Sequence, residues 1–323
     1  MTGAAAGSAT CSGDNAVRVG AAIPFVAGRP PCAAERRAAL TGIAEAGLDH
    51  VMFGDHVSFR GGFGADGLIQ AAAALGARPD LDVYVGAYLL PLRHPVPVAR
   101  QVADLADLAP GRLTLAVGVG GEDRDEIAAC GIDPGTRGAR TNESLIVLRQ
   151  LLTGDPVNFS GTHISVADAR IRPAPSTPVP IVVAGRSEAA LTRAARQGDG
   201  WLGIWVSASR YAQATAAIAE QAATAGRNPA TFHHGLNVWC GLATSRDRAK
   251  DALARAMHNV YQVPYAAFER WCPHGTPDDV AEYLAPYVDA GCHTFNLIPC
   301  GDDTDAVIDM TARVRHLLNQ RST

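Results

Sequence analysis

The chain has 323 residues, of which 47% are hydrophobic and 19% are charged, a composition typical of a soluble globular protein. A formal net charge of -4 provides no basic stripe for nucleic acid and no polybasic segment for a membrane, and we expect neither partner. The seven cysteines are scattered without a CxxC pair, which argues against a disulfide framework or a zinc ribbon and favours reduced thiols in the cytoplasm.

The first sixteen residues lack the basic start and the strongly apolar middle of a secretory signal, and no uncharged apolar segment is long enough to span a bilayer. We therefore predict a loose tail over 1–16 and one folded domain over 17–323. No internal repeat or low-complexity linker divides that domain.

Short apolar runs alternate with amphipathic patterns along the chain, as in βαβ units. Strands are predicted at 17–23, 49–54, 82–90, 112–120, 180–185, 200–206, 236–244 and 293–299. Helices are predicted at 33–48, 66–77, 94–109, 141–154, 187–198, 209–225, 246–260, 277–290 and at the carboxyl end. Two stretches break the rhythm: 121–180, which includes a hairpin at 157–166, and 261–275.

Eight strands with at least eight helices predict a closed (β/α)8 TIM barrel, with the irregular stretches as insertions near its carboxyl-terminal mouth. A doubly wound open sheet is the rival. That fold normally carries a glycine fingerprint after its first strand, whereas PFVAGRPP follows here. The barrel is the better interpretation.

Asp55 and His56 directly follow the second predicted strand, where barrel enzymes carry their chemistry. A carboxylate beside an imidazole suits proton transfer near neutral pH. The alternative is a hydrogen-bonded turn, and the two residues alone do not decide between them.

Gly118, Gly120 and Gly121 end the fourth strand but lack the spacing of a dinucleotide fingerprint. We interpret them as letting a flat ligand approach the backbone. The acids at 122, 123, 125 and 126 are interpreted as a solvated helix start rather than a metal cluster, and no metal is predicted.

Gly185, Arg186 and Ser187 lie where a strand gives way to a helix. Backbone N–H groups, the helix dipole and a guanidinium could converge there on a phosphate. An ordinary serine N-cap is the alternative. Five aromatic residues are candidates to line an apolar mouth, with plain packing as the alternative: Phe63, Tyr88, Trp201, Trp205 and Trp271.

In order and spacing, four segments resemble the bacterial luciferase-like monooxygenase superfamily, and in particular its branch that uses the deazaflavin coenzyme F-420. They are AGLDHVMFGDHV, VGAYLLPLRHPVPVARQVADLADLAPGRLTLAVGVGG, RGARTNESLIVLRQLLTGDPVNFSGTHI and PVPIVVAGRSEAALTRAARQGDGW. The resemblance covers most of residues 17–300. It implies a TIM barrel with its largest insertions near the mouth.

The resemblance also implies where the cofactor binds. The ring would lean on a bulge at the end of the third strand, where the matching bond for a non-proline cis peptide is Tyr88–Leu89. Asp55 and His56 match an acid–histidine pair near the ring's reactive carbon. The family's phosphate loop matches Gly185, Arg186 and Ser187, next to Ala184, with Ile204 and Trp205 on the following strand end. Gly121 and Ser207 replace a glutamate and a lysine of some deazaflavin dehydrogenases, which argues against sugar-phosphate dehydrogenation.

Together with the residues above, the resemblance implies a cytoplasmic oxidoreductase that transfers a hydride between F-420 and a small organic substrate, with His56 as proton donor or acceptor and Asp55 as its electrostatic partner or a ring contact. One alternative is an FMN-dependent monooxygenase supplied with reduced flavin by a separate reductase. A second is a flavin-binding protein without catalysis. A glycosidase has little support, because paired carboxylates on opposite strand ends are not evident. Family members often form homodimers.

Overall fold

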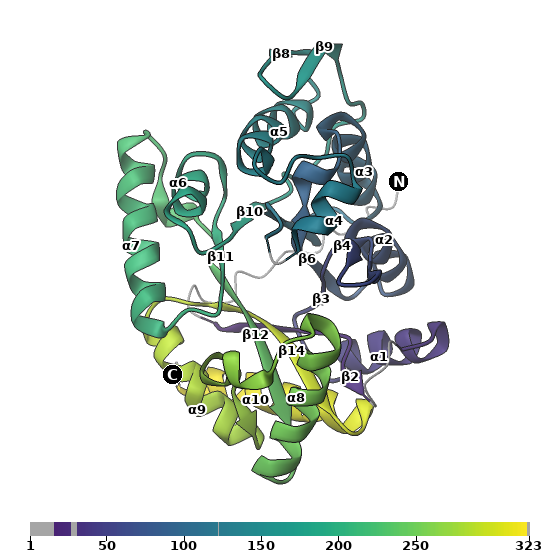
Figure 1. Ribbon diagram of the computed structural model, residues 1–323, viewed down its shortest axis with the longest axis vertical. Coiled ribbons are helices and arrows are strands. Elements are labelled where there is room, and N and C mark those ends of the chain that lie inside the picture. Colours follow the sequence, from purple (N-terminus) through teal and green to yellow (C-terminus); the bar gives the residue numbers. More distant parts are fainter. Residues whose placement is uncertain (1–15, 27–30, 122, 322–323) are drawn as a thin grey trace, which may run out of the picture.

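Eight parallel strands form a closed barrel in the computed structural model (Figure 1), which describes residues 16–26, 31–121 and 123–321. The barrel strands are β1 (Arg18–Ala22), β3 (His50–Phe53), β6 (Asp82–Leu89), β7 (Leu113–Gly118), β10 (Ile181–Ala184), β11 (Trp201–Ile204), β12 (Gly235–Leu242) and β14 (Thr294–Gly301). Each pairs with the next, and β14 closes the barrel by pairing with both β12 and β1. The predicted fold class and all eight predicted strands are confirmed.

The larger helices surround this barrel (Figure 1). They are α1 (Ala33–Glu45), α2 (Gly67–Ala77), α3 (Pro95–Leu108), α5 (Arg137–Leu151), α6 (Glu188–Gln197), α7 (Ala208–Thr224), α8 (Arg246–Tyr261), α9 (Pro277–Asp289) and α10 (Thr304–Arg321). Local signals fix their starts: the Asp66 carboxylate accepts from the N–H groups of Leu68 and Ile69 at the start of α2, and Thr276 and Asp279 form a capping box on α9.

The insertions contain more regular structure than the sequence predicts. β4 (His56–Phe59) and β5 (Phe63–Ala65) form a hairpin directly after β3, and α4 (Arg124–Ala129) lies inside the stretch that was expected to be irregular. The predicted hairpin is present as β8 (Val157–Ser160) and β9 (Ser165–Ala169). The second insertion holds three short elements, η3 (Tyr265–Ala267), η4 (Glu269–Trp271) and β13 (His274–Gly275). The short strand β2 (Phe25–Val26) pairs in parallel with the end of β14.

Strand alternation divides the buried side chains into two clusters. On β12, Leu236, Val238 and Cys240 belong to the cluster between strands and helices, whereas Trp239 belongs to the cluster inside the barrel. Side chains of a strand point to opposite faces in turn, so a barrel strand buried on both faces is apolar almost throughout, as these are. The inner cluster also includes Phe59, Tyr265 and Cys272, which lie in the insertions.

Polar side chains also occupy the barrel interior. His50 on β3 is 2% exposed, and its ring lies so close to Gly20 on β1 that a Cβ there would approach it to 2.1 Å. Burial lowers the pKa of His50 to about 4, and the hydrogen bond with Asn296 offsets only part of this effect. His50 is therefore neutral at physiological pH.

This depressed pKa makes the fold sensitive to acid. As the pH falls, the unfolded chain protonates His50 near 6.5, before the folded chain does near 4. Stability from this residue is thus fully present above pH 6.5 and is lost between 6.5 and about 4. The loss amounts to about 3 kcal/mol. When urea unfolding is measured at pH 7 and at pH 4, the free energy of unfolding should change less between the two pH values in His50→Gln than in wild type, by roughly that amount. The exposed His316→Gln should behave as wild type. Equal differences in all three proteins would contradict this account.

Three further predictions concern the amino-terminal tail, membrane-spanning segments and the cysteines. Residues 1–15 of the predicted tail lie outside the described residues. Among the helices that the structure describes, none is long and apolar enough to cross a membrane. The six described cysteines are free thiols: Cys32, Cys130, Cys240, Cys272, Cys292 and Cys300.

Candidate functional site

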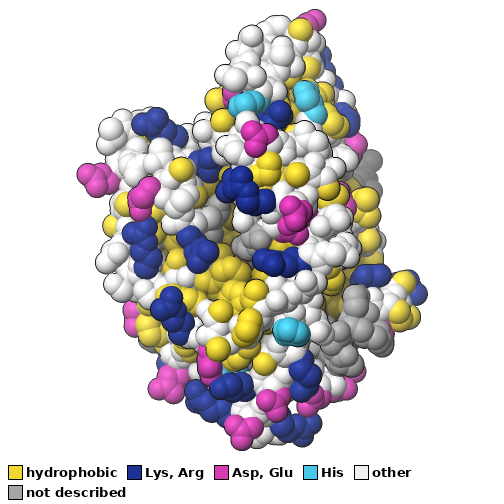
Figure 2. Space-filling model, viewed as in Figure 1, with side chains coloured by type: hydrophobic (Ala, Val, Ile, Leu, Met, Phe, Trp, Pro, Cys, Tyr) yellow, Lys and Arg dark blue, Asp and Glu magenta, His cyan; other side chains and the backbone are white. Residues whose placement is uncertain are grey.

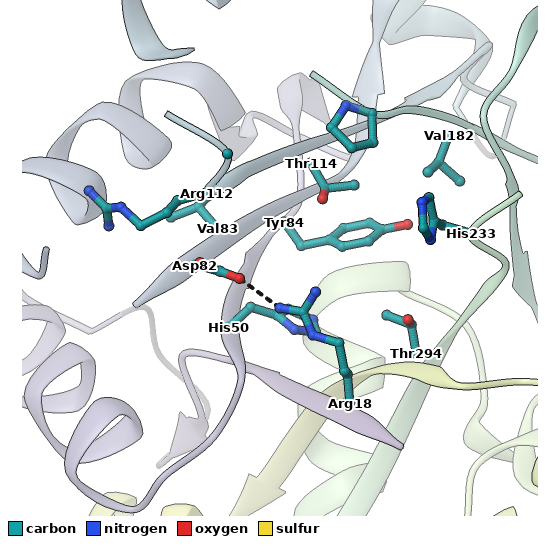
Figure 3. Close-up of a pocket in the computed structure, with 12 residues that line it drawn as sticks. Arg18, His50, Asp82, Val83, Tyr84, Arg112, Thr114, Val182, His233 and Thr294 are labelled. Atoms are coloured by element: carbon teal, nitrogen blue, oxygen red, sulfur yellow. Dashed lines mark hydrogen bonds and ion pairs between the residues drawn. The ribbon is translucent and has the colours of Figure 1, made fainter. Parts of the chain in front are cut away.

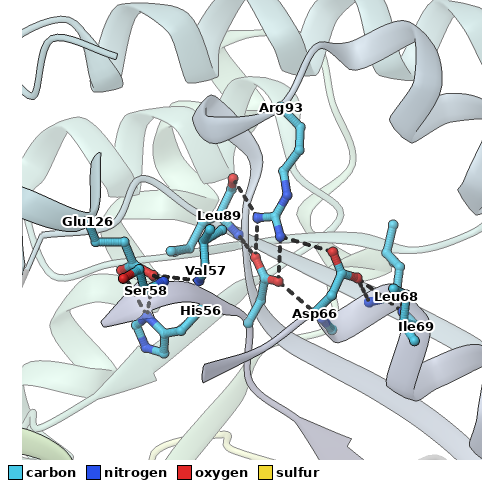
Figure 4. Close-up of polar contacts among 11 residues, drawn as sticks. His56, Val57, Ser58, Asp66, Leu68, Ile69, Leu89, Arg93 and Glu126 are labelled. Atoms are coloured by element: carbon cyan, nitrogen blue, oxygen red, sulfur yellow. Dashed lines mark hydrogen bonds and ion pairs between the residues drawn. The ribbon is translucent and has the colours of Figure 1, made fainter. Parts of the chain in front are cut away.

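The β4–β5 hairpin places His56 at the mouth, the carboxyl-terminal end of the barrel. His56 is the first residue of β4 and its side chain remains 29% exposed. Its Nδ1 lies 3.0 Å from Oε2 of Glu126 on α4, which follows β7 (Figure 4). The ring also packs on Phe59 with centroids 4.3 Å apart. With Nδ1 engaged, Nε2 is the ring nitrogen left to exchange a proton with a ligand.

Glu126 is a candidate site residue that the sequence pattern did not indicate. The acids at the start of α4 were interpreted as solvated, but Glu126 is 3% exposed and accepts hydrogen bonds from the N–H groups of Val57 and Ser58 as well as pairing with His56. Burial alone would raise the pKa of this carboxyl, but these hydrogen bonds outweigh it and lower the pKa. Glu126 is therefore a carboxylate, fixed beside the imidazole.

Asp123 completes the link between α4 and the hairpin. Its carboxylate caps α4 by accepting from the N–H groups of Asp125 and Glu126, and it also accepts from the N–H of Arg60. Asp125 is exposed, as expected, and residue 122 lies outside the described residues. The spacing of a cap at 123 and a buried acid three residues later gave a helix signal, but not the identity of the partner strand.

Replacing Glu126 with Gln should impair His56 while leaving the hairpin in place. Charge-assisted hydrogen bonds contribute about 1.5–3 kcal/mol, so we expect turnover to fall about 10- to 100-fold with a changed pH–rate profile. Asp123→Asn is the matched control, because it weakens the same link without touching His56. An unchanged pH–rate profile in Glu126→Gln, or the same change in both variants, would exclude this role for Glu126.

Asp55 has other partners than the one predicted for it. Its side chain is fully buried and forms a two-point ion pair with Arg93, at 2.5 Å to Nη1 and 2.9 Å to Nη2. It also accepts from the N–H groups of Gly67 and Leu89. The partner of His56 is therefore Glu126 rather than Asp55. Through these bonds Asp55 connects the end of β3, the start of α2 and the end of β6.

The end of β6 forms an irregular platform. The register between β6 and β7 shifts between Gly86 and Tyr88. The non-proline cis peptide joins Gly86 and Ala87, so its predicted place at Tyr88–Leu89 is wrong. Gly86 suits this spot because a Cβ there would press on Tyr84 and Leu202. Tyr88 does not line the mouth, since it is 1% exposed and packs beneath Arg93, whose Cζ lies 4.5 Å from the ring centroid.

The glycines after β7 leave room at the mouth. Gly120 has φ of +67°, a conformation that favours glycine, and its carbonyl accepts from Nε of Arg137. Gly121 is exposed, and a Cβ built there would meet no atom within 4 Å. Backbone is thus accessible to a ligand at this point.

The loop between β10 and α6 places a positive-φ glycine and a serine N-cap at the amino end of a helix. Ala184 ends β10, Gly185 has φ of +133°, and the Ser187 side chain caps α6 by accepting from the N–H of Ala190. A Cβ on Gly185 would approach Ala190 to 2.9 Å, so only glycine fits. The carbonyl of Gly185 accepts from the buried Trp201 indole, which assigns Trp201 to support of this loop rather than to the mouth.

Arg186 and the end of β11 lie beside this loop. The Arg186 guanidinium is 5.4 Å from the Trp205 ring centroid, a cation–π distance. Ile204 ends β11, and Trp205 follows it with φ of +51°. The structure thus brings Arg186 and Trp205 together next to the amino end of α6.

Aromatic residues gather at the mouth. Phe63, Trp205 and Trp271 are partly buried and pack against the inner cluster. Trp205 also contacts Tyr261 and Phe268 at 5.4 and 4.9 Å between centroids. Figure 2 shows hydrophobic side chains gathered in a hollow at the centre of this face, with basic side chains around it. Among the described residues, no group of three or more His, Cys, Asp or Glu could hold a metal ion.

Comparison with known proteins identifies the family. The model of the luciferase-like monooxygenase family matches residues 17–294, and the chain belongs to this family. An uncharacterized protein of Mycobacterium tuberculosis (strain ATCC 25618 / H37Rv) is 40% identical over 113 residues, which cover 35% of this chain and 38% of that protein. The chain thus matches well under half the length of that relative.

Two longer matches involve F420-dependent enzymes. The F420-dependent glucose-6-phosphate dehydrogenase of Nocardia farcinica (strain IFM 10152) is 28% identical over 83% of this chain and 89% of that protein. The structure of an F420-dependent secondary alcohol dehydrogenase in complex with an F420-acetone adduct superposes with a TM-score of 0.82, at 20% identity, over 94% of this chain and 99% of that chain. The structural likeness concerns the fold.

Proposed function

We propose that this protein is an F-420-dependent oxidoreductase that transfers a hydride between the deazaflavin and a small organic substrate. The observation that carries the proposal is the His56–Glu126 pair, held at the mouth by a hairpin and a short helix that follow two different barrel strands. A histidine backed by a buried carboxylate is suited to proton transfer. The relatives named as F420-dependent enzymes support the choice of cofactor.

The residues at the mouth fit this cofactor. Gly185, whose positive φ and close contact with Ala190 only glycine allows, would bind the phosphate together with Arg186 and Ser187 at the start of α6. Ile204 and Trp205 would flank it. The end of β6, including the backbone at Tyr88 and Leu89, would support the ring. Gly120 and Gly121 would let it approach the backbone.

The protein's own residues would provide position and proton transfer. When bound, a deazaflavin supplies two-electron hydride chemistry, because a carbon replaces the flavin N5. His56 Nε2 would accept the proton of a substrate hydroxyl in the oxidative direction and return it in the reductive direction. Glu126 would hold the ring by Nδ1 and so fix its orientation. Asp55, which was predicted as catalytic, would act by fixing the end of β6.

The hollow at the mouth favours an apolar substrate or one with an apolar part. Its aromatic side chains can contact a hydrocarbon moiety, whereas Gly121 and Ser207 provide no charge to recognise a phosphorylated sugar. We therefore propose alcohols, aldehydes and ketones as the first substrate classes to examine.

Anaerobic turnover tests this function. Purified protein with F-420 should change the cofactor's absorbance when an alcohol or carbonyl compound from a panel is added, without dioxygen. Turnover only with reduced FMN and dioxygen, with labelled oxygen entering the product, would instead identify the FMN-dependent monooxygenase, which requires a separate reductase. Tight cofactor binding without turnover would favour the flavin-binding protein.

We also propose a cytoplasmic location and a homodimeric state. The free cysteines of the described residues agree with a cytoplasmic location. A homodimer is proposed from the family resemblance, and the mass in solution would test it.

A further inference from the structure

A chain of buried hydrogen bonds crosses the interior of the barrel. His50 Nε2 on β3 lies 2.6 Å from Oδ1 of Asn296 on β14. The Asn296 amide donates to Oδ1 of Asn237 on β12 at 2.8 Å. The Asn237 amide in turn donates to the carbonyl of Gly86 on β6 at 3.2 Å. The three side chains are between 0 and 8% exposed.

All hydrogen bonds of this hydrogen-bond chain run in the same donor-to-acceptor direction, from His50 toward Gly86. Because each asparagine donates toward Gly86, its oxygen must accept from the preceding residue, so His50 carries its proton on Nε2. Turning the Asn237 amide over would bring its oxygen against the Gly86 carbonyl, an arrangement of two acceptors. The low pKa of His50 keeps it neutral. Every link is satisfied in this arrangement, and aligned hydrogen bonds of this kind polarise one another.

The hydrogen-bond chain begins at the amino-terminal end of the barrel and ends at Gly86, the fifth of the eight residues of β6. His50 lines a pocket of about 200 Å³ at the amino-terminal end (Figure 3), next to the Arg18–Asp82 ion pair and Tyr84. Gly86 lies where β6 loses its register with β7, in the carboxyl-terminal half of the strand. Asn237 therefore connects the barrel interior to the irregular end of β6.

This end of β6 is held from two sides. Asn237 binds the Gly86 carbonyl from across the barrel, and Asp55 binds the Leu89 N–H from the side of α2. Where a register shift interrupts the ladder, side chains take over the bonds that a neighbouring strand would provide. Asp55 and Asn237 thus determine where the backbone of 86–89 lies.

We infer that His50, Asn296 and Asn237 are positioning residues for the cofactor, acting through the Gly86 carbonyl on the segment of β6 that supports the ring. This inference rests on the proposed function, which assigns the ring to that segment. None of the three residues needs to touch the ligand. Their effect on binding is transmitted by the backbone of Gly86.

The test compares Asn237→Leu with Asn319→Leu. Asn319 makes two hydrogen bonds with the backbone of Val17, far along the chain from β6, so the control loses the same side-chain chemistry elsewhere. Titration of F-420 into each protein would give its dissociation constant and the absorption spectrum of the bound cofactor, and urea unfolding would give stability. Asn237→Leu should bind about tenfold more weakly with a shifted spectrum, while Asn319→Leu should lose stability but bind as wild type does.

Equal dissociation constants and spectra in the two variants would overturn the inference. If Asn237→Leu does not fold, the pair His50→Gln and His50→Leu decides: glutamine can still donate to Asn296 and should preserve binding, whereas leucine should weaken it. Loss or preservation of binding in both His50 variants alike would count against the chain. If wild type binds FMN and not F-420, the proposed cofactor is wrong. The inference is then tested by titrating the two variants with FMN instead. If wild type binds neither ring, both proposals fall.

Discussion

Turnover should fall by about 10²- to 10⁴-fold when His56 is replaced by Ala, because a positioned proton donor or acceptor contributes acceleration of that order. The F-420 dissociation constant should change by no more than a few fold. His56 lies on the hairpin after β3, whereas the proposed phosphate and ring contacts lie on β6, α6 and β11. The loss should therefore appear in kcat and not in cofactor binding.

Steady-state rates and a cofactor titration on the same preparations would measure this split. Val57→Ala provides the control, since Val57 lies next to His56 on β4 with its side chain in solvent at 49% exposure. It should retain both turnover and binding. Normal turnover in His56→Ala would remove the histidine from the mechanism, and lost cofactor binding would make it a binding residue.

Asp55→Ala should produce the largest loss of stability. It leaves the Arg93 guanidinium without its two-point partner, and the N–H groups of Gly67 and Leu89 without an acceptor. Removing one partner of a buried ion pair typically costs about 3–5 kcal/mol. Urea unfolding would measure the loss, and Asp80→Ala, which breaks the exposed pair with Arg78, should cause no measurable change.

A second substitution separates this structural role from direct chemistry. Asp55→Asn retains the shape of the side chain but loses the charge that faces Arg93. If Asp55 acts by holding the end of β6, Asn should lower stability and weaken cofactor binding together. A variant with wild-type stability and binding but without turnover would restore Asp55 as a catalytic residue.

The sequence predicted the barrel well because its strands carry two independent signals. Each is a short apolar run, as a strand buried on both faces must be, and each is followed by a helix, several of which begin at a capping residue such as Asp66, Ser187 or Thr276. The helix that was expected to begin at 141 begins earlier, at Arg137. That boundary was hidden because α4 and the residues after it are short, charged and rich in glycine.

The sequence predicted where the site residues lie better than it predicted which residues they contact. Residues 55 and 56 were placed correctly at a strand end, but adjacent side chains on an extended segment point to opposite sides. Asp55 therefore turns inward to Arg93, whereas His56 meets Glu126, 70 residues away along the chain. Periodicity reports which side of an element is buried, and Glu126 lies on a helix of six residues, too short to show it.

The interior hydrogen-bond chain illustrates a different limit. Asn237 and Asn296 lie in apolar strands, where an isolated asparagine gives no signal of its partner. Their pairing depends on the closure of the barrel between β12 and β14, at the register Asn237 opposite Asn296. Only the three-dimensional structure brings His50 and Gly86 to the two ends of that pair.

Equilibrium binding of the purified apoprotein to F-420 and, side by side, to FMN tests the central claim most directly. Trp205, next to Arg186 at the proposed phosphate loop, makes tryptophan fluorescence a suitable signal. The account predicts clear preference for F-420, with binding weakened in Arg186→Ala. Preference for FMN would contradict it and make the monooxygenase the working model.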